Sequence, residues 1–207
     1  MVVPMDQLTF IFIGRSGCGK GTQAKLLMEE LKRRDPANEV FYLETGAKFR
    51  EFVESGRFEN PYSHKLARAI YDSGALQPEF LTVWIWADAL IKKLTGHEHL
   101  IFDGTPRKLH EARVLHSAME FYGRRKPFVI YLDVAREWAT ARLLARGRRD
   151  DANLTEINHR MDWFESEVLP TVAFYEKNPA YALCDIHGDR SIEEVHRDVV
   201  KAVFGEQ

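Results

Sequence analysis

Five short apolar runs punctuate the chain, separated by longer stretches of mixed polarity. The runs span residues 8–13, 40–43, 99–102, 128–133 and 181–186. Most of them are continuous instead of alternating between apolar and polar positions, which is the pattern of strands buried on both faces of a parallel sheet. The sequence therefore predicts five buried strands.

Helical patterns fill the stretches between these runs. The clearest places Ala24, Leu27 and Leu31 on one face, has charged residues on the other, and stops before Asp35-Pro36. Because strand and helix alternate along the chain, we predict an α/β fold with a doubly wound, five-stranded parallel sheet flanked by helices. In such folds the active site lies at the carboxyl ends of the strands.

The connection between the second and third predicted strands is much longer than one crossover helix requires. We therefore expect residues 44–78 to form a small helical lobe, with Gly56 and Gly74 as helix stops. A helix should follow Pro78. Its tryptophans, Trp84 and Trp86, are predicted to pack in the core and not to form a stacking platform.

Length and composition limit the possible functions. A chain of 207 residues predicts one domain over residues 1–207, and a net charge of −2 predicts no general attraction to nucleic acid or to an anionic membrane. Neither a leader nor a membrane-spanning run is evident, so we expect a cytoplasmic protein. The two cysteines form neither a disulfide framework nor a zinc cluster. No coiled-coil seam is visible, and a monomer is expected.

The turn after the first apolar run predicts a phosphate-binding loop. Gly14, Gly19 and Lys20 fit the spacing G-x-x-x-x-G-K-[ST], although Gly21 stands where serine or threonine is usual. Glycines allow successive backbone N–H groups to point at an anion, while the helix start and Lys20 add positive charge. The alternative is a strand-to-helix turn that merely tolerates glycine. The predicted ATP-binding residues of the loop are Gly17, Cys18, Gly19, Lys20, Gly21 and Thr22.

Two later features could act on a phosphate held there. Asp103 ends the third apolar run, where it could hold Mg²⁺ through the water shell of the ion; alternatively it caps a helix or a turn. Arg142 and Arg146 lie one helical turn apart, and Arg148 and Arg160 follow. A series of arginines is usually a solvated surface, here with Asp150 and Asp151 as partners, but beside a phosphate loop we favour an anion clamp.

With these motifs in order, nearly the whole chain resembles the adenylate kinase and UMP/CMP kinase family of nucleoside monophosphate kinases. Residues 14–23 resemble the family loop G-x-x-G-x-G-K-G-T-Q, in which glycine follows the lysine as Gly21 does here. Thr45-Gly46 with Arg50 resembles T-G-x-x-x-R, and residues 74–78 resemble G-x-L-x-P. Residues 103–107 resemble D-G-F-P-R.

This resemblance implies a role for each matching residue. The implied monophosphate-binding residues are Thr45, Gly46, Arg50, Gly74, Leu76, Gly104, Arg107 and Glu111. The implied catalytic residues are Lys20, Arg107, Arg146, Arg148 and Arg160. Asp103 is implied to hold magnesium through water, and Arg142 to lie over the ATP adenine.

Several positions depart from the family pattern. The lid region, residues 142–160, is very short and has no zinc-binding insertion, so its closing motion should be small. One residue more than usual separates Asp151 from Arg160, which affects the register of that arginine. Thr105 replaces the usual phenylalanine, and Ala47 replaces an acid.

Glu111 is the departure that bears on the substrate, because adenylate kinases carry glutamine there and UMP/CMP kinases carry asparagine. An ionised carboxylate only accepts hydrogen bonds, so it suits the two donors of guanine, or the amino group of cytosine, better than the adenine edge. A Glu111 kept protonated by burial would regain a donor and read adenine. Alternatively, Glu111 points to solvent.

The predicted reaction transfers the γ-phosphoryl group of ATP, with Mg²⁺ as cofactor, to a nucleoside monophosphate. AMP is the first choice of acceptor, with CMP, UMP or GMP as alternatives. One rival is a P-loop kinase for another small metabolite, in which Arg50 and Arg107 hold a different anion. A second rival is an inactive nucleotide-binding module whose lobe serves a protein partner. For the favoured kinase the expected partners are small-molecule nucleotides, with no nucleic acid and no membrane.

Overall fold

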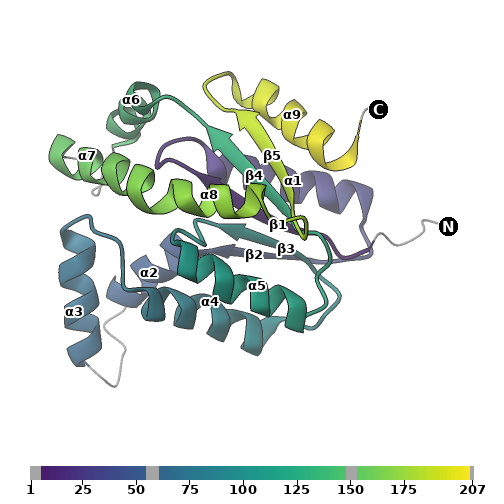
Figure 1. Cartoon of the computed structure of the whole chain (residues 1–207), viewed down its shortest axis with the longest axis horizontal. Helices are drawn as coiled ribbons and strands as arrows, with labels where there is room; N and C mark the ends of the chain where they lie inside the picture. The colour runs from purple at the N-terminus through teal and green to yellow at the C-terminus, as the bar shows by residue number, and fades with distance from the viewer. Residues whose placement is uncertain (1–5, 55–60, 148–152, 206–207) are drawn as a thin grey trace.

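A five-stranded parallel sheet lies between two layers of helices in the computed structural model (Figure 1). The structure describes residues 6–54, 61–147 and 153–205. The strands are β1 (Thr9–Gly14), β2 (Val40–Glu44), β3 (His99–Asp103), β4 (Phe128–Asp133) and β5 (Ala182–His187). Their order in the sheet is β2-β3-β1-β4-β5, and every pairing is parallel. The predicted fold class is confirmed.

Each predicted strand is present, with ends that agree to within one residue. Four strands extend one residue beyond their apolar run, to Gly14, Glu44, Asp103 and His187. These residues remain in the hydrogen-bonded ladder, where Glu44 pairs with Asp103 and Gly14 pairs with Leu132. Polar side chains are thereby fixed at the carboxyl edge of the sheet.

Strand β1 shows why its sequence is apolar at every position. Phe10 and Phe12 face a core shared with α1 (Lys20–Arg34) and α9 (Ile192–Phe204). Ile11 and Ile13 face the opposite core, which includes side chains of α4 (Glu79–Lys93), α5 (Leu109–Phe121) and α8 (Leu169–Glu176). Figure 1 shows α4 and α5 on one side of the sheet and α1 and α9 on the other.

Two helices, α2 (Thr45–Glu54) and α3 (Pro61–Asp72), occupy the region predicted as a lobe. They have a small core of their own, in which Phe52 and Ala67 contact the first half of α4. Gly74 adopts a left-handed conformation with φ +69° just after α3, as expected for a helix stop. The other predicted stop, Gly56, lies outside the described residues.

The two tryptophans of α4 differ. Trp86 is buried, with 2% of its surface exposed, as predicted for a core residue. Trp84 remains 46% exposed, so the prediction of core packing was wrong for this residue. Its ring contacts Phe52 of α2 edge-on, with ring centroids 5.8 Å apart. Trp84 therefore covers the small core of α2 and α3 from its outer side.

The second half of the chain carries the predicted arginine helices, α6 (Arg136–Arg146) and α7 (Leu154–Trp163). A π-helical turn, η2 (Phe164–Val168), joins α7 to α8 without a break. Arg148, Asp150 and Asp151, at the predicted tip of the lid, lie outside the described residues. Across the described ranges, the search for a helix long and apolar enough to cross a membrane finds none.

Candidate functional site

A cavity of about 1220 Å³ opens at the carboxyl edge of the sheet. Its walls come from the loop after β1, the helices α2, α6 and α7, and the turns that follow α3 and β3. The predicted site residues around it are Gly17, Gly19, Lys20, Gly21, Thr22, Thr45, Gly46, Arg50, Gly74, Leu76, Asp103, Gly104, Arg107, Glu111, Arg142, Arg146 and Arg160. Residues far apart in the sequence thus meet around one space.

Glycine is required at two positions of the phosphate loop for different reasons. Gly17 has φ +87°, and a Cβ atom there would lie 2.8 Å from the carbonyl oxygen of Ala139. Gly21 has no such strain, but its Cβ atom would lie 3.2 Å from Oδ2 of Asp103. The glycine after Lys20 therefore leaves room for the Asp103 carboxylate, which gives a physical reason for the departure from serine or threonine.

Lys20 is held at the mouth of the loop by the loop itself. Its Nζ atom donates to the carbonyl oxygens of Gly14, at 2.6 Å, and Arg15, at 2.9 Å. Cys18 is buried, and its Sγ atom lies 3.4 Å from the same Nζ atom. Cys18 is absent from the described cavity wall, so its side chain fills the loop from inside while the backbone and Lys20 face the cavity.

Asp103 lies at the end of β3 and faces the loop. Its Oδ2 atom accepts a hydrogen bond from the hydroxyl of Tyr42 at 2.9 Å. Burial raises the pKa of Asp103, and the positive charge of Lys20 opposes this shift. The next helix along the chain, α5, begins only at Leu109, and its N-terminal cap position is Lys108. Asp103 therefore caps no helix, and its carboxylate is of the ligand type that Mg²⁺ prefers.

On the other side of the cavity, Arg50 already has a carboxylate partner. Its Nη2 atom donates to Oε1 of Glu44 at 2.7 Å, and about a third of each side chain is exposed. Glu44 was not predicted as a site residue. Its position as the polar end of a buried strand, next to Thr45, is the signal that could have identified it. The hydroxyl of Thr45 is buried and has no hydrogen-bond partner among the described residues.

Arg107 is fixed by the turn that carries it. Its Nε atom donates to the carbonyl oxygen of Gly104 at 3.0 Å, and its guanidinium carbon lies 5.4 Å from the ring centroid of Trp163. Burial lowers the pKa of Arg107, although a guanidinium stays charged in proteins. Trp163 was also missed; it lies one helical turn beyond Arg160, on the face of α7 that meets the cavity.

Glu111 does not point to solvent, so that alternative is wrong. Only 2% of its surface is exposed, and both carboxylate oxygens are engaged. The hydroxyl of Thr105 donates to Oε1, and the backbone N–H of Arg107 donates to Oε2 at 2.7 Å. Burial raises the pKa of Glu111, while these two donors favour the ionised form. Thr105 and Glu111, which both depart from the family pattern, are therefore hydrogen-bonded to each other.

The arginine helices contribute further positive charges. Arg142 and Arg146 lie on α6 and are exposed at the cavity, where the guanidinium of Arg142 lies 4.7 Å from the ring centroid of Trp138. Arg160, on α7, is buried, with 8% of its surface exposed, and reaches the same cavity. Arg148 falls outside the part of the chain that the structure describes.

Comparisons with known proteins agree with this arrangement. The model of the adenylate kinase family matches residues 12–180. Adenylate kinase 1 of Nostoc sp. is 33% identical over 94% of this chain and 97% of its own length. An adenylate kinase of Corynebacterium diphtheriae is 29% identical over 95% of this chain and 99% of its own length. Uridylate kinase of Saccharomyces cerevisiae is 27% identical over 96% and 92% of the two chains. The chain belongs to the adenylate kinase family of phosphotransferases.

Proposed function

We propose that this enzyme transfers the γ-phosphoryl group of ATP to a nucleoside monophosphate, with AMP as the preferred acceptor. The observation that carries this proposal is the single cavity shared by the phosphate loop and two acceptor-side arginines, Arg50 and Arg107. Its volume, about 1220 Å³, exceeds the 300–1,000 Å³ typical of sites for one small ligand. The cavity therefore has room for two nucleotides.

The donor side consists of the phosphate loop, the start of α1 and Arg142. Lys20 and the backbone N–H groups of the loop hold the β and γ phosphates, because the helix start and the ammonium both favour anions. The guanidinium of Arg142 stacks on the adenine of ATP, a contact suited to a planar cation. Trp138 supports that guanidinium from its other side.

Asp103 is the residue that fits Mg²⁺ on this donor side, because its buried carboxylate faces the loop across Gly21. Asp103 would hold the magnesium ion through water, and the ion would supply positive charge to offset that of the ATP phosphates. Tyr42 orients the carboxylate through its hydrogen bond to Oδ2. Glycine at position 21 keeps the space between the carboxylate and the loop open.

The acceptor side holds the monophosphate, and its own phosphate oxygen is the nucleophile. Because that oxygen is already anionic, no general base is needed, and catalysis consists of aligning two polyanions and neutralising their charge. Arg50 and Arg107 hold the acceptor phosphate, while the buried hydroxyl of Thr45 and the carboxylate of Glu111, which both line the cavity, read the base.

Arginines from the lid region complete the site. Arg146 and Arg160, with Arg148, neutralise charge on the transferred group, a contact worth about 10³ to 10⁵ in rate in related phosphoryl transfer. Residues 142–160 and the lobe of residues 44–78 close over the nucleotides and exclude water, because otherwise ATP would be hydrolysed. The substrates are small nucleotides, and the enzyme acts in the cytoplasm as a monomer. Sedimentation of the purified chain tests the oligomeric state.

A panel of AMP, GMP, CMP and UMP, each with ATP and Mg²⁺, tests the assignment. Transfer to AMP with the largest kcat/KM is expected. The S. cerevisiae relative is a uridylate kinase, and Glu111 is a carboxylate, so the other bases belong in the same panel. Turnover with none of the four contradicts the proposal and favours a kinase for another metabolite. Tight ATP binding without transfer favours an inactive binding module.

A further inference from the structure

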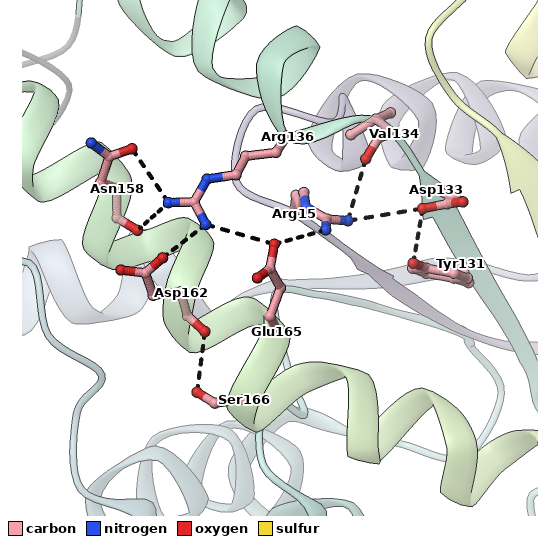
Figure 2. Close-up of polar contacts among 9 residues, drawn as sticks. All are labelled: Arg15, Tyr131, Asp133, Val134, Arg136, Asn158, Asp162, Glu165 and Ser166. Atoms are coloured by element: carbon pink, nitrogen blue, oxygen red, sulfur yellow. Dashed lines mark hydrogen bonds and ion pairs between the residues drawn. The ribbon is translucent and has the colours of Figure 1, made fainter.

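Arg15, the second residue of the phosphate loop, makes a set of contacts that phosphate binding does not explain. Its Nη1 atom donates to the carbonyl oxygen of Val134 at 3.3 Å, and its Nη2 atom donates to Oε1 of Glu165 at 3.1 Å. Its guanidinium carbon lies 4.6 Å from the ring centroid of Phe164. Figure 2 shows the Arg15 side chain lying between Val134, which follows β4, and Glu165 in the π-helical turn η2.

The Arg15 end of these contacts is sheltered. Only 13% of the Arg15 side chain is exposed, and Phe164 is fully buried. The Glu165 side chain is 43% exposed, so this ion pair contributes little by itself and fixes the geometry together with the contacts of Arg15 to Val134 and Phe164. The position of the phosphate loop is therefore tied to the positions of Val134, Phe164 and Glu165.

Those three residues flank the two helices, α6 and α7, that carry Arg142, Arg146 and Arg160. Val134 precedes α6, while Phe164 and Glu165 follow α7 in the π-helical turn η2. A second arginine, Arg136 at the start of α6, joins the two helices, because its Nη1 atom lies 2.8 Å from Asp162 and 3.7 Å from Glu165 (Figure 2). Glu165 thus forms ion pairs with two arginines, Arg15 of the loop and Arg136 of α6.

We infer that Arg15 is a positioning residue that keeps the phosphate loop in register with α6 and α7. This inference rests on the proposed function, in which the phosphates of ATP contact the loop on one side and the arginines of these helices on the other. Phosphoryl transfer depends on such alignment, since a misplacement of about 1 Å can cost about 10²-fold in rate. Arg15 is not a catalytic residue, because it acts through the loop and the helices.

The Arg15→Ala variant tests this role through the two Michaelis constants. We expect the KM for ATP to rise about tenfold and kcat to fall, while the KM for the best monophosphate acceptor changes by less than about twofold. The acceptor constant should hold because Thr45 and Arg50 belong to α2, and because Arg107, although it contacts Trp163, is held in its own turn by the carbonyl oxygen of Gly104. A merely structural loss of folded enzyme would change neither Michaelis constant.

Arg34→Ala is the matched control. Arg34 also pairs with one carboxylate, Glu30, and lies over one aromatic ring, that of Phe204, with 16% of its side chain exposed. It lies at the opposite end of α1 from the loop. Both Michaelis constants should stay at the wild-type values in this variant. An equal rise in the KM for ATP in the control would overturn the assignment to Arg15.

Glu165→Ala removes the same bridge from its exposed side, so it tests the inference even where Arg15→Ala folds poorly. We expect the effects of the two substitutions to be less than additive in the double variant, because both remove the same ion pair. Unchanged constants for ATP in both single variants, or strictly additive effects, overturn the inference. A wild-type chain that transfers no phosphate in the acceptor panel instead contradicts the proposed function, so the two failures are distinguishable.

Discussion

The proposed donor and acceptor halves of the cavity differ in the groups that line them. The proposed donor half presents mainly backbone with Lys20 and Arg142, and a side chain at position 17 or 21 would meet Ala139 or Asp103. The acceptor half presents side chains already engaged with one another, Glu44 with Arg50 and Glu111 with Thr105. Backbone N–H groups bind phosphates whatever base the nucleotide carries. Side chains, in contrast, can be substituted and can thereby change which base is bound. Substrate choice should therefore reside in the acceptor half.

Lys20→Ala should have the largest effect and break the donor half. Removal of the full charge at the loop should lower kcat by about 10³-fold, because no other lysine or arginine of the loop faces the γ phosphate in the proposed complex. A coupled assay measures the rate, and circular dichroism checks that the fold is intact. Lys32→Ala, on the exposed part of α1, is the control. Near-normal activity of the first variant would refute the donor-side assignment.

Arg107→Ala should break the acceptor half alone. We expect kcat/KM for the monophosphate to fall by about 10²-fold, because a charge-assisted contact to the acceptor phosphate is lost. The KM for ATP should stay at its wild-type value. Arg113→Ala, on the exposed face of α5, controls for the loss of one arginine. An equal rise of both Michaelis constants would mean that the two halves are not separate.

Glu111→Gln sharpens the comparison, because it changes the proposed base-reading group, although it also replaces one of the two oxygens that accept from Thr105 and Arg107. Glutamine can both donate and accept, so kcat/KM for AMP relative to GMP should rise about tenfold. Steady-state rates with AMP, GMP, CMP and UMP measure this preference. Identical relative rates in the variant and the wild type would show that Glu111 only secures the turn through Thr105 and the N–H of Arg107.

The same ratio should depend on pH in the wild-type enzyme. Burial raises the pKa of Glu111, so the fraction of its protonated form, which can donate to adenine, increases as the pH falls. Relative use of AMP over GMP should therefore rise by a few fold as the pH falls, and decline as the pH rises through that pKa. The ratio cancels the titration that all acceptor phosphates share. A flat profile is expected for Glu111→Gln, and a flat wild-type profile would exclude this reading of the base.

Glu44→Gln should have the smallest effect. Because a third of each partner is exposed, the ion pair with Arg50 is worth little, and the KM for the acceptor should rise only about threefold. The cause would be poorer orientation of the guanidinium. Glu51→Gln, which weakens the exposed pair with Lys48 on the same helix, is the matched control. A lower KM would instead show that Glu44 competes with the acceptor phosphate for Arg50.

The fold could be predicted from the sequence because each strand faces two cores. Phe10, Ile11, Phe12 and Ile13 form a continuous apolar run, and that run is visible without any knowledge of the neighbours. The strand ends were less visible, because Glu44 and Asp103 are polar but still pair in the ladder. Trp84 was misjudged because the sequence of α4 does not show that α2 covers only one side of the ring.

The candidate site was predictable where a motif places its residues along one turn, as in the phosphate loop and around Asp103. Pairings between side chains could not be predicted in the same way. Thr105 and Glu111 read as two separate departures, although a turn brings them into contact. Arg15 and Glu165 are 150 positions apart, and only the packing of η2 against the loop shows that they meet.

The small core of α2, α3 and the first half of α4 has a consequence for how this enzyme could evolve. Phe49, Phe52, Val53, Ala67, Leu81 and Ile85 form this core separately from the two cores that cover the sheet. Mutations in it can move the acceptor-binding side chains of α2 with little effect on the packing of the strands. A lineage could thus acquire a new acceptor by drift in these helices, while the sheet and the phosphate loop stay under unchanged selection.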